Sequence, residues 1–224
     1  MSLLDVVTLD GPAGAGKSTV AREVARRLGY RYLDTGAMYR AVTLLALREG
    51  TAPDDEVGLE RLLAGLSMEF RPDGHLWVNG EDLTREIRSR EVTASVSEYA
   101  SSHAVRLAMS RLQRAMGEGG RLVCEGRDMG SVVFPDARLR IYLDASPEIR
   151  ARRRQKELEE TGQTVDFEEL LREIRERDTK DASREEAPLQ RVEGQILLDT
   201  STLSKEEVID QITRLAQTAP DQAR

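Results

Sequence analysis

A glycine-rich stretch near the N-terminus has the residue types and the spacing that bind phosphate. The stretch GPAGAGKST, residues 11–19, contains the pattern G-x-x-x-x-G-K-[ST] between an apolar run, residues 6–10, and a helical pattern. Glycine adopts backbone angles closed to other residues, so consecutive N–H groups of such a loop can converge on one anion. The positive end of the following helix points to the same place. The stretch therefore predicts a loop that binds the polyphosphate of ATP or GTP.

Two side chains of this loop carry most of its chemistry. Lys17 supplies a full positive charge to the outer phosphates, and the Ser18 hydroxyl is placed to reach a Mg²⁺ ion that bridges them. The alternative, a plain strand-to-helix turn with an exposed lysine, does not account for the complete motif in its expected context. The residues assigned to ATP are Gly11, Pro12, Ala13, Gly14, Ala15, Gly16, Lys17, Ser18 and Thr19.

The loop alone does not define the reaction, because switches, motors, transporters and small-molecule kinases share it. The sequence has no N-K-x-D signature for reading guanine and no long apolar strand ending in D-E. Transfer of a phosphoryl group onto a small acceptor is therefore favoured.

Alternation of strand-like and helix-like segments predicts the elements that position the loop. Strands are expected at residues 6–10, 30–35, 121–126, 139–145 and 195–200. Interleaved helices imply an open parallel sheet covered on both faces, whose ligands bind beyond the carboxyl ends of the strands. Polar residues follow these ends, among them Asp34, Arg127, Asp128 and Asp144.

One region departs from this alternation. Residues 66–83 contain short strand-like runs joined by two turns, the second at Asn79-Gly80, and this predicts an antiparallel insertion. Residues 87–116 are helical, with a break near residues 101–103. Helix starts are marked by Ser146 with Pro147, by Asp166 with Glu169 and by Ser204 with Glu207, and helix ends by Gly29 and Gly50.

Composition excludes several classes of protein. Charged residues make up 33% of the 224 residues, the net charge is −7, and this balance argues against binding of polymeric nucleic acid. The single cysteine, Cys124, excludes an intramolecular disulfide and is expected to be a buried, inert thiol. His75 and His103 have no metal-ligand spacing.

No apolar run is long enough for a membrane span, and MSLLDVV at the start predicts a strand rather than a signal peptide. The last residues, TAPDQAR, are expected to fray. A cytoplasmic enzyme is the expected setting.

Several longer segments resemble those of the bacterial cytidylate kinase (CMP kinase) family, within the nucleoside monophosphate kinase group. The matching segments, which extend from near residue 9 to near residue 210, are LDGPAGAGKST, YLDTGAMYRAV, EGRDMGSVVFPDA, IYLDAS, RERDTKDASREEAPL and LLDTSTLSKEEVI. DTGAMYR and GRDMGSVVFPDA are much more specific to this family than the phosphate loop is.

The resemblance implies an α/β P-loop kinase fold with a five-stranded parallel sheet, flanking helices, the small antiparallel insertion and a helical lid. It places the core at residues 1–35, 117–146 and 186–224, the monophosphate-binding domain at about 36–116, and the lid at about 150–168. It also implies a monomer.

The resemblance further implies a CMP site composed of Thr35, Tyr39, Ser97, Arg106, Arg127, Asp128, Arg177, Asp181 and Arg184. In the family, the residues matching Ser97, Arg106 and Asp128 recognise cytosine. Those matching Arg177 and Asp181 hold the sugar, and those matching Arg127 and Arg184 hold the phosphate. These roles suit the residue types, because a carboxylate accepts from the cytosine amine and arginine forks match phosphate oxygens.

Each assignment has a structural alternative. Arg177 and Asp181 have the spacing of an ordinary surface ion pair. Asp128 could cap the segment after it, and Tyr39 could be a core aromatic with its hydroxyl at the rim. Glu125 could add charge near Mg²⁺ or could be a simple carboxylate at the end of a strand.

The basic run at residues 150–154 is either a solvated helix face or, by resemblance, the part of the lid that closes over the phosphoryl group. Arg154 is assigned to ATP on that basis. Lys17, Arg127 and Arg184 are assigned to catalysis, without a general base, because positioning and positive charge dominate phosphoryl transfer.

The function expected is ATP- and Mg²⁺-dependent phosphorylation of CMP and dCMP to the diphosphates, in pyrimidine nucleotide metabolism. Two alternatives remain. The first is a kinase for another small acceptor, such as UMP or a non-nucleotide alcohol. The second is a nucleotide-binding regulator, which would lack an acceptor site.

Overall fold

The computed structural model describes residues 4–71, 73–160 and 162–219, and it divides into two compact units. The core unit comprises the chain up to Tyr32 and from Gly119 onward, and the helical unit comprises Leu33–Glu118. The expectations for residues 1–3 and 220–224, at the two ends, lie outside the described residues. Within the described residues, no helix is both long and apolar enough to cross a membrane.

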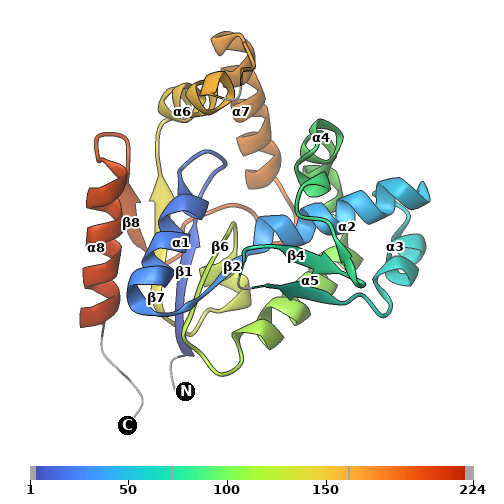
Figure 1. Cartoon of the computed structure of the whole chain (residues 1–224), viewed down its shortest axis with the longest axis horizontal. Coiled ribbons are helices and arrows are strands. Elements are labelled where there is room, and N and C mark those ends of the chain that lie inside the picture. Colours follow the sequence, from blue (N-terminus) through green and yellow to red (C-terminus); the bar gives the residue numbers. More distant parts are fainter. Residues whose placement is uncertain (1–3, 72, 161, 220–224) are drawn as a thin grey trace. The chain divides into compact units, whose positions relative to one another are not determined.

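A five-stranded sheet is the centre of the core unit, in the order β2-β6-β1-β7-β8 (Figure 1). The strands are β1 (Leu4–Asp10), β2 (Arg31–Asp34), β6 (Leu122–Gly126), β7 (Ala137–Asp144) and β8 (Ile196–Asp199). β1 pairs in parallel with β6 and β7, and β7 pairs in parallel with β8. The expected fold class and all five expected strands are confirmed.

Helices α1 (Lys17–Leu28) and α8 (Lys205–Thr218) pack on the central strands of this sheet. Val20 and Val24 of α1 and Ile209 and Ile212 of α8 share one hydrophobic core with β1, β6 and β7. The expected helix ends are also confirmed, since Gly29 ends α1 with a φ of 66°. α8 begins with a complete capping box between Ser204 and Glu207.

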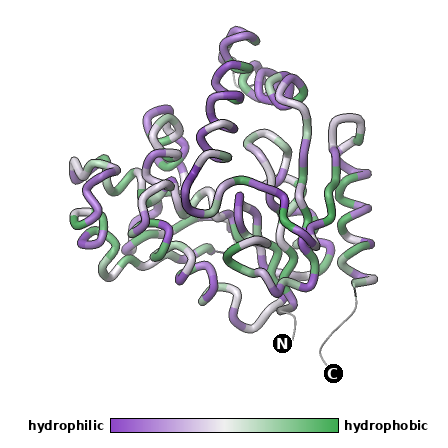
Figure 2. The backbone as a smooth tube through the Cα atoms, turned by 180° about the vertical axis from the view of Figure 1, so that it is seen from behind, coloured by the Kyte–Doolittle hydropathy of each residue, from purple (hydrophilic) through white to green (hydrophobic). Residues whose placement is uncertain are grey.

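Two further helices of the core unit, α6 (Pro147–Glu160) and α7 (Phe167–Ala182), follow β7. They lie side by side in Figure 1, and Phe167, Leu171 and Ile174 of α7 pack on Ala151 of α6. Hydrophilic residues predominate along both helices, whereas hydrophobic stretches gather in the sheet (Figure 2). α6 and α7 therefore depend on polar contacts as well as on this small apolar cluster.

The helical unit contains α2 (Thr35–Glu49), α3 (Glu56–Leu63), α4 (Arg90–Tyr99), α5 (His103–Gly117) and the 3₁₀ turn Glu86–Arg88. Its antiparallel sheet consists of β3 (Met68–Phe70), β4 (Leu76–Val78) and β5 (Glu81–Asp82). The expected insertion is thus confirmed, with its turn at Asn79-Gly80 in positive φ. The expected break between helices is confirmed as well, because Ser102 caps α5.

α3 is a helix that the sequence pattern does not predict. Leu59, Leu62 and Leu63 have helical spacing and Leu59 is buried, but the eight residues are too few to show a clear helical period. Asp55 caps its start by accepting a hydrogen bond from the Gly58 N–H. α3 in turn supports α5, since the Glu56 carboxylate accepts from the N–H groups of His103 and Ala104.

Candidate active site

The glycine-rich loop connects the end of β1 to the start of α1, as its sequence predicts. Gly11, Gly14 and Gly16 all have positive φ. A side chain at Gly11 is excluded by space as well, because an added Cβ would lie 2.0 Å from the Leu143 carbonyl oxygen. The loop is therefore held tightly against β7 at its first residue.

Lys17 is buried in this loop, where its Nζ donates a hydrogen bond to the Pro12 carbonyl at 2.7 Å. Burial of the ammonium group, followed by the positive charge of Arg127, lowers the pKa of Lys17 from 10.5 to about 7. Arg177 lowers it as well, and Glu125 and Asp10 oppose the shift. The alternative of an exposed lysine on a plain turn is wrong. Lys17 interacts electrostatically with the two arginines expected at the acceptor side.

Ser18 is joined to the end of β6. Its hydroxyl donates to the Glu125 carboxylate at 2.5 Å, and the Tyr32 hydroxyl donates to the same oxygen at 3.4 Å. Glu125 is buried. Its carboxylate therefore lies at the hydroxyl that was assigned to Mg²⁺.

A hydroxyl and a carboxylate are hard oxygen ligands of the kind that Mg²⁺ takes together with substrate phosphates. No group of three or more His, Cys, Asp or Glu residues suited to a metal ion occurs in the described ranges. The donor set present thus fits a magnesium ion that arrives with a nucleotide, rather than one held by protein ligands alone.

Asp10 is a residue that the sequence analysis did not single out. Its buried carboxylate accepts from the backbone N–H groups of Met129 and Gly130, at 2.8 and 2.7 Å, and from the Gln195 amide at 2.8 Å. A Cβ at Gly130 would lie 2.7 Å from the Thr8 hydroxyl, so the backbone passes very close to β1 there. Asp10 therefore fixes the loop that follows Arg127 and Asp128 to the strand that leads into the phosphate loop.

Asp128 is itself buried at the start of the π-helical turn Met129–Val133. Its side chain makes no capping hydrogen bond to that turn, so the alternative role as a cap is wrong. The backbone carbonyl of Asp128 accepts from the N–H groups of Val132 and Val133 instead.

Asp181 of α7 lies between two arginines. It accepts from Arg127 Nε at 2.9 Å with one oxygen and from Arg184 Nη2 at 2.5 Å with the other. Burial pushes the pKa of Asp181 upward, but the charges of Arg127 and Arg184 outweigh it, and the net shift is downward. Asp181 is only 1% exposed, so the alternative of an ordinary surface ion pair with Arg177 is wrong.

The other residues expected to bind CMP belong to the helical unit. Thr35 and Tyr39 lie in the first turns of α2, Ser97 lies on α4, and Arg106 lies on α5. Thr35 and Arg106 are buried, and Tyr39 and Ser97 are half-buried. The Arg106 guanidinium donates to the Ala100 carbonyl at 3.4 Å, and α2 packs on both α4 and α5. The helical unit therefore brings together the three helices that carry these residues.

The arginines of the basic run in α6 have different surroundings. Arg154 has a half-exposed side chain and pairs with Glu157, whereas Arg153 donates to the hydroxyl and the carbonyl of Thr200. Arg150 is 2% exposed. The run is therefore not one uniformly solvated helix face.

Several known proteins similar to this chain are cytidylate kinases. The family described as cytidylate kinase matches residues 7–218. A cytidylate kinase from Geobacter sp. (strain M21) is 44% identical over 93% of this chain and 91% of its own length. One from Pelotomaculum thermopropionicum is 48% identical over 92% of this chain and 93% of its own. A bifunctional pantoate ligase/cytidylate kinase from Trichormus variabilis is 48% identical over 92% of this chain, which spans 40% of that relative's length.

The lowered pKa of Lys17 predicts proton uptake when a polyphosphate binds. Most of the Lys17 population is neutral at pH 8, because its pKa is about 7, and a bound anion favours the charged form. Titration calorimetry with magnesium-free ADP at pH 8, in two buffers of different ionisation enthalpy, should give an uptake of roughly one proton. Lys17→Arg should abolish the uptake, because arginine stays charged. Equal uptake by both proteins would contradict this account.

Asp10 predicts a specific pH dependence of stability. Burial raises the pKa of Asp10 from 3.8 to about 6, although its N–H partners oppose the shift. The folded protein thus binds more protons than the unfolded chain between these values, so this group adds stability as the pH falls from 7 to 5. Urea unfolding should show the difference between wild type and Asp10→Asn growing by about 1 kcal/mol over that interval. A difference that does not change with pH would refute the assignment.

Proposed function

Since this chain belongs to the cytidylate kinase family, we propose that it transfers the γ-phosphoryl group of ATP to CMP and dCMP, giving ADP with CDP or dCDP. The observation that carries the proposal is the set of cations around Lys17. Lys17 interacts electrostatically with Arg127 and Arg177 in the same unit. Such a gathering of like charges is unfavourable in itself and suits a site where donor and acceptor phosphates meet.

In this proposal the phosphate loop holds the donor. The loop of residues 11–19 binds the polyphosphate through its backbone N–H groups, which all of these residues except Pro12 possess, and Lys17 contacts the outer oxygens. Ser18 and Glu125 hold Mg²⁺, which neutralises phosphate charge when it is bound with ATP. Ser18 and Glu125 are already joined by a hydrogen bond, so both oxygen groups are available at one place.

Arg127 and Arg184 hold the acceptor phosphate in this proposal. Both arginines are oriented by the same carboxylate, Asp181, so their forks have a fixed relation to each other. Asp181 and Arg177 take the sugar of CMP. Asp128, Ser97 and Arg106 read cytosine, and Thr35 and Tyr39 are the further residues proposed to bind CMP. A uracil carbonyl would face a carboxylate where cytosine presents an amine, and this disfavours UMP.

The chemical step needs positioning and positive charge rather than proton abstraction. The transferring phosphoryl group carries negative charge on its outer oxygens through a loose transition state. Lys17, Arg127 and Arg184 offset that charge, and no general base is proposed. The proposed lid, at about residues 150–168, excludes water from the reaction, and Arg154 contacts ATP.

We further propose a role for the helical unit, an oligomeric state and a location. The helical unit is the monophosphate-binding domain, and the enzyme acts as a monomer in the cytoplasm. Phosphorylation of a different acceptor, UMP above all, is the second candidate.

Acceptor preference tests the proposed function directly. ADP release, measured in a coupled assay with CMP, dCMP, UMP, AMP and GMP, should be fastest with CMP or dCMP. Faster turnover with UMP or AMP would sink the proposal. ATP binding without turnover of any acceptor would favour the regulator instead.

A second prediction concerns Asp181. Asp181→Ala removes the carboxylate that orients Arg127 and Arg184, so the KM for CMP and dCMP should rise by about tenfold or more, the equivalent of one lost hydrogen bond to a charged group. ATP binding should change much less. Asp199→Asn, at an exposed carboxylate that accepts from the Ser201 N–H, is the matched control and should leave both values unchanged. An effect of Asp181→Ala on the KM for ATP alone would be incompatible with its acceptor-side role.

A further inference from the structure

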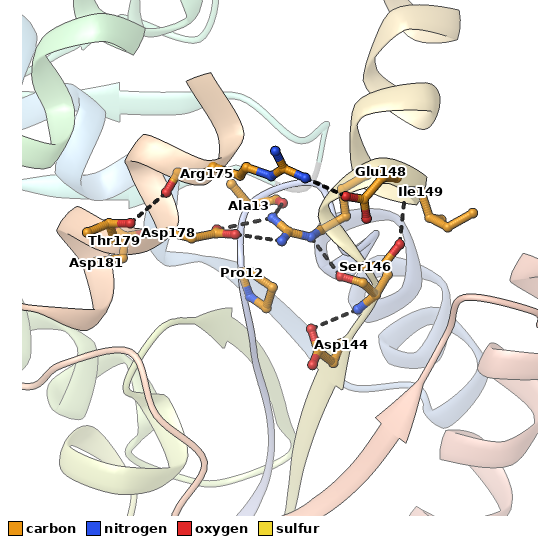
Figure 3. Close-up of polar contacts among 12 residues, drawn as sticks. Pro12, Ala13, Asp144, Ser146, Glu148, Ile149, Arg175, Asp178, Thr179 and Asp181 are labelled. Atoms are coloured by element: carbon orange, nitrogen blue, oxygen red, sulfur yellow. Dashed lines mark hydrogen bonds and ion pairs between the residues drawn. The ribbon is translucent and has the colours of Figure 1, made fainter. Parts of the chain in front are cut away.

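Arg150 is a buried cation on α6 whose guanidinium joins three separate segments. Nε donates to the Ala145 carbonyl at 2.8 Å, after β7, and Nη1 donates to the Ala13 carbonyl at 3.1 Å, in the phosphate loop. The same guanidinium forms a two-pronged ion pair with Asp178 of α7, at 3.1 and 2.5 Å. Figure 3 shows Ala13 and Asp178 close together around these contacts.

The phosphate loop also packs against the stem of Arg150. A Cβ added at Gly14 would lie 3.2 Å from the Cβ of Arg150. Since Gly14 has a φ of 79°, both space and backbone conformation favour glycine there. The loop is therefore held at two successive residues, Ala13 by a hydrogen bond and Gly14 by contact.

Asp178 connects this contact to the acceptor side. It lies one helical turn before Asp181, which binds Arg127 and Arg184. Because α7 is a continuous helix from Phe167 to Ala182, its backbone fixes the relation between the two carboxylates. A continuous series of contacts thus extends from Ala13 through Arg150 and α7 to Arg127 and Arg184, the arginines assigned to the acceptor phosphate.

The energetics make the pair hard to break. A guanidinium that is 2% exposed has lost most of its hydration, and a bidentate carboxylate is the partner that best compensates for this loss. Removal of Asp178 leaves a buried cation with only carbonyl partners. The guanidinium would then be free to shift, and the Ala13 carbonyl would shift with it.

We propose that Arg150 and Asp178 are positioning residues for phosphoryl transfer. They fix the position of the phosphate-loop backbone relative to α7. They thereby also fix the position of Lys17 relative to Arg127 and Arg184. The proposal rests on the proposed function. Each substrate can still bind when the loop is displaced relative to α7. The transferring phosphoryl group and its acceptor are then poorly aligned, so kcat falls while both KM values change little.

The same two helices provide a matched control. Arg175 of α7 and Glu148 of α6 form an ion pair at 2.7 Å, with side chains 59% and 46% exposed. This pair also ties α6 to α7 (Figure 3), but within the described residues neither side chain forms a hydrogen bond or ion pair with the phosphate loop. Glu148→Gln therefore removes a helix–helix tie while leaving the Arg150 contacts in place.

The experiment compares Asp178→Asn with Glu148→Gln in the full chain, by steady-state kinetics with CMP and ATP and by Tm. Asp178→Asn should lower kcat by about 100-fold, the usual cost of misplacing reacting groups by about 1 Å. Both KM values should stay within a factor of about three, because each nucleotide keeps its own contacts. Glu148→Gln should keep kcat within a factor of about two, as expected for an exposed pair.

Unchanged kcat in Asp178→Asn would overturn the proposal. An equal loss of kcat in Glu148→Gln would also overturn it, because it would indicate that the two residues only tether α6 to α7. A change in Asp178→Asn that is confined to the KM for CMP or for ATP would overturn it as well. If Asp178→Asn is unfolded at the assay temperature, Arg150→Lys replaces it under the same criteria, because lysine keeps the charge and loses the fork. Wild type serves as the separate test of the proposed function, since that function fails if CMP does not stimulate ADP release by the unmodified chain.

Discussion

Compensation of buried charge is the constraint on which this structure depends. The carboxyl edge of the sheet and the adjacent helices contain Asp10, Lys17, Glu125, Asp128, Arg150 and Asp181, all with little exposure to solvent. A buried ion without a partner costs several kcal/mol, so the chain must supply partners for such groups. Asp10 has three N–H donors, Asp181 has two arginines, and Arg150 has Asp178. All of these partners except Arg184 come from distant parts of the sequence, and they tie the loops of the site together.

The same compensation explains how the site could accelerate transfer. A phosphoryl group is stabilised by cations that are already in place, and fixed cations cost no reorganisation during the reaction. Arg127 and Arg184 keep their positions because both bind one carboxylate, while Lys17 is held against the carbonyl of Pro12. Under the proposed function, the burial that makes these groups costly to the fold is also what makes them effective toward phosphate.

The sequence predicts the elements of the fold well, because their signals are local. Apolar runs mark the five strands, the glycine spacing marks the phosphate loop, and Ser204 with Glu207 marks the start of α8. α3 is missed because its eight residues are too few for the spacing of Leu59, Leu62 and Leu63 to stand out as a helical period. Local pattern is therefore sufficient for elements that are long enough to show a periodic apolar face.

The partners of the charged residues are not predictable in this way. Arg127 and Asp181 are separated by 54 positions, and Asp10 and Gln195 by 185, so no local spacing links them. Arg150 belongs to a basic run that resembles a solvated helix face, yet it is the buried member of that run. Asp181 has the spacing of a surface ion pair with Arg177, and only the packing of α7 shows that it is buried. Family resemblance assigned roles to several of these residues, but it did not identify Asp10, Gln195 or the pairing of Arg150 with Asp178.

The most direct test of the account is a crystal structure of the chain with CMP, ADP, Mg²⁺ and a planar metal fluoride in place of the transferring phosphoryl group. The account predicts that Lys17, Arg127 and Arg184 contact the fluoride or the acceptor phosphate, and that Ser18 and Glu125 lie at the metal, directly or through water. Asp128 and Arg106 should contact the cytosine. A complex in which the CMP phosphate is bound without Arg127 or Arg184 would contradict the account.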